Sequence, residues 1–388
     1  MANRIHFPTL SNLNYLLPIF FLTLITLYRI IISLLFYGGG DSSNVQSFSI
    51  LYDFNINIYS IKAHWPYFPF ASSFLLICNF LSNFFLLETI QIYKIITTIF
   101  EFFISLIIFN YQKLYHNTFK STFIASLYLL SPISIIIISI LGFNDVLFIY
   151  FFILALFLLK NEKNNFLSLI FLSLSISIKP VSLIFVPYFL YKSKNIIFSF
   201  LVIVTFMIIF NFYFIFQFGF SSFLNLFSEI IYKLVFGYQK SPLGIGYFDF
   251  IFGFKALKFI TIFGILISLS FYIYLIDKNK FIFASTILIS IILFRYNTHP
   301  QYFMWSIPFL FLTNKWKYGF YFSLISGLTV AAFLFHWDKN GAAFSMLSIF
   351  FNYLSPYSVS TPNYFIDITG FIYPNLYTTL KIKNVSRS

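Results

Sequence analysis

The sequence predicts an all-α polytopic membrane protein with about twelve transmembrane helices. Of its 388 residues, 60% are hydrophobic and only 9% are charged, whereas soluble chains have about 25% charged residues. Apolar runs follow one another along the chain, separated by short polar segments. Lysines and arginines in those segments fall on one side if the runs cross a membrane in alternation. Together these observations exclude a soluble enzyme, a disordered chain and a nucleic-acid binder.

Charge and cysteine usage agree with this class. The net charge of +13 is assigned to membrane topology, so no nucleic-acid partner is expected. The single cysteine, Cys78, excludes a disulfide framework and a cysteine metal cluster.

The expected crossings follow from the apolar runs, because a spanning helix needs about 20 mostly apolar residues. Strong candidates are 14–37, 90–112, 121–141, 146–159, 196–217, 256–276, 281–294, 302–313 and 318–335. The run 166–191 has Lys179-Pro180 in its middle. Since proline favours a break, we expect two half-helices that meet there. A last, weak crossing is expected within 342–380.

Orientation depends on the basic loops. The side that carries most lysines is assigned to the cytoplasm, with both termini there, in a plasma or inner membrane. This holds if 67–87 does not cross, so we expect an interfacial helix at the outer face. The alternative, a true crossing, places Lys113 and Lys120 outside. The chain is then a single domain, 1–388, with long outer loops at 38–93 and 218–255.

Few acidic residues exist, and two stand out by position. Asp41 follows three glycines at the outer end of the first crossing, where the backbone can turn sharply and a ligand can approach closely; the alternative is an interfacial loop acid. Asp145 opens the fourth crossing, where an acid also suits the N-terminus of a helix. Glu101 lies inside an apolar run, where a charge is costly, and either pairs with Lys94 or faces the bundle.

Basic and aromatic residues complete the candidate outer face. Lys179, at the tip of the half-helix pair, either binds a phosphate or extends to the interface. Arg295 and His299 share an outer turn with Gln301, which suits a phosphate or pyrophosphate head group. The segment that carries His64, Trp65 and Tyr67 is either an aromatic belt or a stacking surface for a sugar.

These motifs, in this order, resemble the GT-C superfamily of polytopic membrane glycosyltransferases, in particular its polyprenyl-phosphate-sugar-dependent, mannosyltransferase-like members. The resemblance covers about residues 14–315. It is carried by Asp41, by Trp65-Pro66-Tyr67-Phe68-Pro69, by Gly142-Phe143-Asn144-Asp145, by Ser175-Ile176-Ser177-Ile178-Lys179-Pro180 and by His299-Pro300-Gln301-Tyr302-Phe303. The Asp-x-Asp pair of the family is missing from the first outer loop, so no cofactor is assigned and divalent-metal use is left open.

The resemblance implies transfer of a mannose-like hexose from a polyprenyl-phosphate donor to a lipid-linked or glycan acceptor at the extracytoplasmic face. It makes Asp41 the general base that deprotonates the acceptor hydroxyl. Lys179, Arg295 and His299 are the candidates that stabilise the leaving phosphate, and Asn144 and Asp145 orient the donor or the acceptor. Membrane lipids surround the bundle.

Other functions compete with this interpretation. An O-antigen-type polymerase or ligase also acts on lipid-linked sugars, but it is expected to use arginines in outer loops. A lipid-linked-sugar flippase or transporter needs a continuous polar path and often has repeated halves. A structural scaffold does not explain the gathering of polar groups on one face.

Overall fold

The structure, a computed structural model, describes residues 13–35, 69–143, 145–159, 165–236, 257–276, 279–294 and 300–337. Every regular element in these ranges is a helix, which confirms the all-α class for the described residues. The chain divides into two compact units, Met1–Val330 and Ala331–Ser388. The single domain expected over 1–388 stays a prediction.

The helices begin and end close to the predicted apolar runs. The elements in the first half of the chain are α1 (Leu13–Leu35), α3 (Pro69–Phe85), α4 (Thr89–Gln112), α5 (Thr118–Leu129), α6 (Pro132–Ser134), the π-helix η1 (Ile135–Ile140), α7 (Asp145–Leu158) and α8 (Phe166–Ile178). They are followed by the 3₁₀ helix η2 (Pro180–Phe185), α9 (Val186–Tyr191), α10 (Ile196–Phe210), α11 (Phe212–Phe218), α12 (Phe220–Phe236), α14 (Leu257–Leu275), α15 (Lys280–Phe294), the 3₁₀ helix η3 (Pro300–Trp305), α16 (Ile307–Phe311) and α17 (Trp316–Trp337).

Two described helices are long and apolar enough to cross a membrane by themselves, Tyr15–Leu35 and Thr89–Gln112. Two bent pairs raise this number to four if each pair is one span: Thr118–Leu129 with Pro132–Ile140, bent by 42°, and Ile196–Phe210 with Phe212–Phe218, bent by 62°. Most of the other expected crossings correspond to shorter apolar helices. The chain therefore has helices that can span a membrane, while about twelve crossings remain a prediction.

The bend in the expected crossing 121–141 has a local cause. Pro132 lacks a backbone N–H and restricts Ser131 to an extended conformation, and Ser131 has ψ 127°. The helix α5 therefore ends at Leu129, and a new helix starts at Pro132. The expected crossing 121–141 is therefore a bent pair of helices and not one continuous helix.

The break predicted at Lys179-Pro180 is confirmed. The helix α8 ends at Ile178, and η2 begins at Pro180. The hydroxyls of Ser175 and Ser182 lie 2.7 Å apart, whereas residues seven apart in a continuous α-helix are separated by about 10 Å along its axis. The chain therefore folds back on itself at Lys179.

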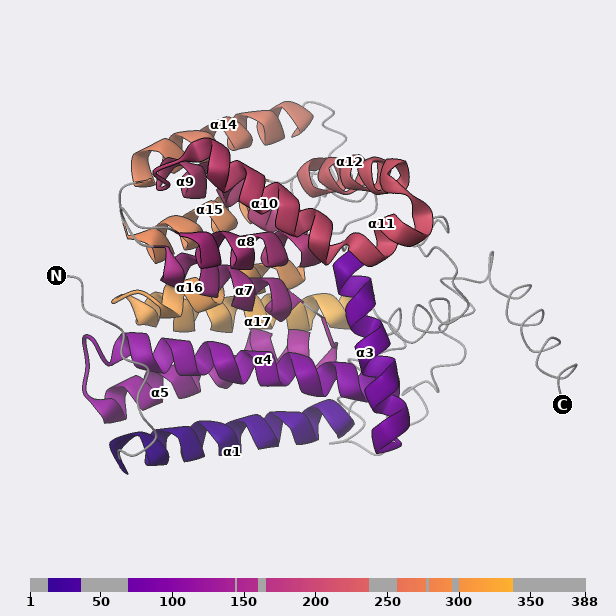
Figure 1. Cartoon of the computed structure of the whole chain (residues 1–388). Coiled ribbons are helices and arrows are strands. Elements are labelled where there is room, and N and C mark those ends of the chain that lie inside the picture. Colours follow the sequence, from indigo (N-terminus) through magenta and orange to yellow (C-terminus); the bar gives the residue numbers. More distant parts are fainter. Residues whose placement is uncertain are drawn as a thin grey trace, which may run out of the picture. The chain divides into compact units, whose positions relative to one another are not determined.

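Helix packing within the first unit brings distant segments together. The helix α4 packs on α1, α3, α5 and α7, and α8 packs on α7 and α10. In Figure 1, α1, α4 and α7 run in a similar direction, whereas α3 runs steeply to them. The interfacial position expected for 67–87 stays a prediction.

Burial along α1 shows how such a helix sits in the unit. Its buried residues Leu22, Thr26, Arg29 and Ser33 recur with a helical period, so they form one stripe that faces the neighbouring helices. The opposite face of the helix is exposed and apolar, including Leu17 at 73% and Phe20 at 60%. An exposed surface of this kind is suited to lipid.

Candidate functional site

Two ion pairs are enclosed in the apolar interior of the described residues. One joins Arg29 to Glu101, and the other joins Lys179 to Asp145. A buried charge is costly unless it is paired and hydrogen-bonded. The two pairs differ in how completely their polar atoms are satisfied.

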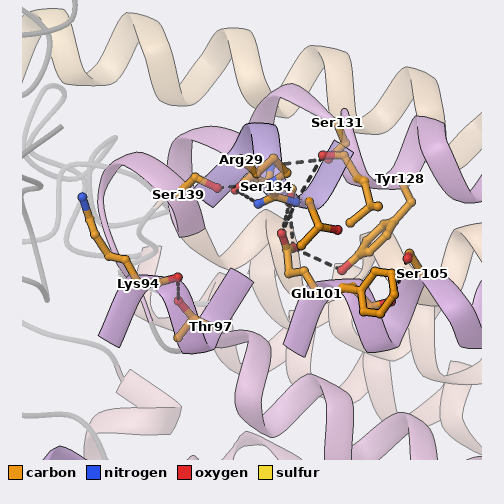
Figure 2. A network of polar contacts seen from close by, with 12 residues as sticks. Arg29, Lys94, Thr97, Glu101, Ser105, Tyr128, Ser131, Ser134 and Ser139 are labelled. Atoms are coloured by element: carbon orange, nitrogen blue, oxygen red, sulfur yellow. Dashed lines mark hydrogen bonds and ion pairs between the residues drawn. The ribbon is translucent and has the colours of Figure 1, made fainter. Parts of the chain in front are cut away.

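The pair of Arg29 and Glu101 belongs to a dense polar network (Figure 2). Arg29 Nε donates to Ser139 Oγ at 3.1 Å, Nη1 donates to the Leu129 carbonyl at 3.1 Å, and Nη2 donates to the Ser134 carbonyl at 3.2 Å. The Leu129 carbonyl is the last of α5 and has no partner within that helix. Arg29 therefore satisfies a group that the break at Pro132 exposes.

Glu101 is equally well satisfied. Its carboxylate accepts from Ser134 Oγ at 2.6 Å and from Tyr128 Oη at 3.2 Å, in addition to contacting Arg29. The expected alternative that Glu101 pairs with Lys94 was wrong. The ammonium of Lys94 donates to the Ser33 carbonyl at 3.2 Å and points away from Glu101 in Figure 2. The network connects α1, α4, α5 and the π-helix η1, so we assign it a structural role.

The second pair is placed by two local features of the backbone. Gly142 has φ +69°, a left-handed conformation that glycine adopts without strain, and it redirects the chain just before α7 begins at Asp145. Lys179 is extended, with φ −144° and ψ 126°, because a residue before proline disfavours the helical region. The fold-back of η2 thus brings Lys179 to the N-terminus of α7.

Asp145 uses only part of its hydrogen-bonding capacity. Its Oδ1 pairs with the ammonium of Lys179, and its position in the first turn of α7 is favourable for an acid. Its side chain is fully buried, and within the described residues its Oδ2 has no hydrogen-bond partner. An unsatisfied buried acceptor of this kind costs about 1–3 kcal/mol.

Aromatic rings surround the ammonium of Lys179. Its Nζ lies 4.9 Å from the centre of the Trp305 ring, 5.1 Å from that of Tyr302 and 5.8 Å from that of Phe148. These distances are in the range of cation–π contacts. Tyr302 and Trp305 belong to η3, and residues three apart share one face of a 3₁₀ helix. Trp305 is fully buried, and its Nε1 also has no partner among the described residues.

Hydrogen bonds tie further motifs to the Lys179 turn. The Phe70 amide, next to Pro69, donates to Asn211 Oδ1 at 3.1 Å, and Asn211 Nδ2 donates to Ser177 Oγ at 3.1 Å. Ser175 Oγ donates to the Phe148 carbonyl at 2.8 Å and so locks α8 onto α7. The end of the Pro-aromatic-Pro segment is therefore held beside the Lys179 motif.

The structure thus brings together part of each described motif. Asp145, Lys179 and Tyr302 lie around one point, which we call the Lys179 site, together with Phe148 and Trp305. The other predicted site residues lie outside the described residues: Asp41, His64, Trp65, Tyr67, Asn144, Arg295 and His299. Gln301 belongs to η3, and its side chain lies outside the described part.

No family model matches the chain, and neither a curated protein nor a solved structure does. The functional argument therefore depends on the site geometry and on the sequence motifs. Within the described residues, no group of three or more His, Cys, Asp or Glu side chains forms a candidate metal site.

Some residues of the Lys179 site were not predicted from the sequence. Trp305 and Phe148 looked like ordinary apolar residues of expected crossings, and Asn211 lay inside the run 196–217. A signal for Trp305 was present, because it follows Tyr302 of the quoted motif by three residues. Reading that signal requires knowing that this segment forms a 3₁₀ helix.

Proposed function

We propose that the protein is a membrane glycosyltransferase with a GT-C-like architecture. It transfers a mannose-like hexose from a polyprenyl-phosphate donor to a lipid-linked or glycan acceptor at the extracytoplasmic face. The supporting observation is the meeting of Asp145, Lys179 and Tyr302 in one site. These residues come from separate motifs of the resemblance, and nothing in their spacing along the sequence requires them to meet.

The reaction sets the demands on the site. The acceptor oxygen forms a bond with the anomeric carbon of the donor sugar, while the bond between that carbon and the phosphate oxygen breaks. The acceptor hydroxyl loses its proton to a general base, and the lipid phosphate leaves with the electron pair. The site must therefore stabilise a developing negative charge and orient a sugar that carries several hydroxyls.

The Lys179 site contains groups suited to these demands. The ammonium of Lys179 carries a positive charge that suits a leaving phosphate, and it pairs with Asp145. Lys179 is the residue that we assign to the leaving phosphate, and Asp145 orients both Lys179 and the bound sugar. We assign the general base to Asp41 and further phosphate contacts to Arg295 and His299, on the resemblance alone.

The experiment uses the purified full-length chain in sealed lipid vesicles with radiolabelled polyprenyl-phosphate mannose and a membrane-lipid extract as acceptor. Lys179→Met removes the ammonium and keeps most of the apolar stem, and Asp145→Asn removes the charge of its partner. Each is expected to reduce transfer at least about 100-fold, since a charge-stabilising contact contributes about 3 kcal/mol to catalysis. The exposed Lys315→Met is the matched control and keeps wild-type transfer.

A single variant leaves its charged partner buried and is expected to lose stability. The double variant Asp145→Leu with Lys179→Met removes both charges, so it separates folding from activity. It is expected to fold and to lack transfer. Wild-type transfer by a folded double variant contradicts the proposal. Movement of label across the membrane without transfer identifies a flippase, and linking of repeat units identifies a polymerase.

A further inference from the structure

We propose that Asp145 Oδ2 and Trp305 Nε1 form a recognition site for one hydroxyl of the transferred sugar. The inference rests on the proposed function and deepens it, because it makes Trp305 a specificity-determining residue of the Lys179 site. The observation behind it is that one hydrogen-bond acceptor, Asp145 Oδ2, and one donor, Trp305 Nε1, lack partners among the described residues. Both side chains contact the ammonium of Lys179.

Both atoms are buried without a hydrogen-bond partner among the described residues. Asp145 and Trp305 are both 0% exposed, and neither Asp145 Oδ2 nor Trp305 Nε1 has a hydrogen-bond partner in the described part of the chain. Most buried side-chain polar atoms are hydrogen-bonded, so each exception needs an explanation. By contrast, both carboxylate oxygens of Glu101 in the other buried ion pair have partners.

The geometry places both atoms around Lys179. Asp145 Oδ1 contacts the ammonium, and the centre of the Trp305 ring lies 4.9 Å from Nζ. Trp305 is held by its neighbours: its ring centre lies 4.3 Å from that of Tyr302 and 5.7 Å from that of Phe148. A side chain fixed in this way loses no further rotamer freedom when a ligand binds.

The hydrogen-bonding character of the two atoms selects the chemistry of the ligand. A carboxylate oxygen only accepts and an indole N–H only donates. A hydroxyl group does both, so a single hydroxyl can satisfy the two atoms together. The phosphodiester of the donor has no proton to offer to Oδ2 and is repelled by its charge, and an ammonium cannot accept from Nε1. The pair therefore fits a sugar hydroxyl, next to the ammonium that we assign to the phosphate.

Recognition of this kind discriminates strongly. If the sugar lacks the hydroxyl, two buried polar groups stay unpaired, and such analogues are rejected far more strongly than analogues that differ in apolar groups. One of the two bonds has a charged acceptor, and bonds of this class change affinity by about 10- to 100-fold. We expect a penalty of that size for one deoxy position of the sugar.

The test measures kcat/KM for polyprenyl-phosphate mannose and for its 2-, 3-, 4- and 6-deoxy forms. It compares the wild-type chain with Trp305→Phe, which keeps an aromatic ring and removes the N–H. Trp316→Phe, a change of the same type at a tryptophan outside the site, is the matched control. Thermal unfolding of each variant shows that the comparison is made on folded protein.

In the wild type and in Trp316→Phe, one deoxy donor is expected to lose about 10- to 100-fold in kcat/KM. In Trp305→Phe that penalty shrinks at least about threefold, because the hydroxyl has already lost one of its partners, and the penalties for the other positions stay the same. A purely structural role of Trp305 lowers the activity with all donors equally and leaves every penalty unchanged.

The outcomes separate the two proposals. Equal penalties in Trp305→Phe and the wild type at every position overturn the hydroxyl site and leave the glycosyltransferase proposal standing; the two atoms then hold a structural water. If the wild-type chain transfers no sugar from any polyprenyl-phosphate donor, the proposed function fails and this inference fails with it.

Discussion

The replacement of Glu101 by glutamine tests the structural role of the buried network. The change conserves the size of the side chain, so it opens no cavity and isolates the loss of charge. The amide oxygen can still accept from Ser134 or Tyr128. The amide nitrogen or the uncharged oxygen then faces Arg29, whose guanidinium keeps its bonds to Ser139 and to two carbonyls and loses its counter-charge.

The magnitude follows from the burial of the pair. Both side chains are 0% exposed, so solvent does not compensate the uncovered charge of Arg29. Removal of one partner from such a pair costs about 3–5 kcal/mol. We expect Glu101→Gln to lower the free energy of unfolding by an amount in this range. Arg29→Met is expected to have a similar effect, because it also leaves the Leu129 carbonyl without a donor.

The assay is unfolding in mixed micelles with an increasing fraction of denaturing detergent, followed by helicity. Thr98→Val is the matched control on the same helix: Thr98 is fully buried, and within the described residues its hydroxyl has no partner. This control is expected to stay within about 0.5 kcal/mol of the wild type. The double variant Arg29→Met with Glu101→Gln completes a double-mutant cycle. The expected coupling energy between the two side chains is about 2 kcal/mol. Additive single effects, or a Glu101→Gln variant as stable as the wild type, refute a connecting role for the pair.

Three further substitutions test how the site is positioned. Gly142→Ala, at φ +69°, is expected to cost about 1–2 kcal/mol and to reduce transfer by displacing the start of α7; an equally stable variant in the same unfolding assay contradicts this. Gly327→Ala places a Cβ 2.8 Å from Pro132 Cβ, and we expect a loss of about 1–3 kcal/mol, measured by thermal unfolding. Lys280→Gln removes the cation that donates to carbonyls at the C-terminal end of α7, including that of Phe157 at 3.4 Å. This variant is expected to lose about 1 kcal/mol of stability, so the amide hydrogens in the last turn of α7 should exchange faster with solvent. Hydrogen exchange at the wild-type rate contradicts this expectation.

The helices could be predicted well from the apolar runs, and their breaks only where proline marks them. The run 90–112 became α4, Thr89–Gln112, because burial in an apolar phase demands a continuous helix. The break at Lys179-Pro180 was predicted for the right physical reason. The break at Ser131-Pro132 was missed, although it carries the same signal. Asn211, where α10 ends, has no comparable signal, since its role depends on contacts with Ser177 and Phe70.

The polar pairs show a similar limit. Arg29, Glu101 and Lys179 could be recognised in the sequence as charges inside apolar runs, where each needs a partner. The partner itself is set by packing: Arg29 and Glu101 are far apart in sequence and meet because α1 packs on α4. Proximity along one helix favoured Lys94 as the partner of Glu101, but the Lys94 ammonium is directed to the Ser33 carbonyl.

The two buried ion pairs differ in the groups that surround their charges. Around Arg29 and Glu101, hydroxyls and helix-end carbonyls surround the charges, so the pair is closed and a ligand has nothing to add. Around Asp145 and Lys179, aromatic rings lie beside the ammonium, and among the described residues a carboxylate oxygen and an indole N–H have no hydrogen-bond partner. In a water-poor interior an unsatisfied polar atom is destabilising, and proteins retain such strain chiefly at functional sites. If the proposed function holds, substitutions at the Lys179 site should change activity directly, and substitutions at the Arg29 network should change stability first and activity only through it.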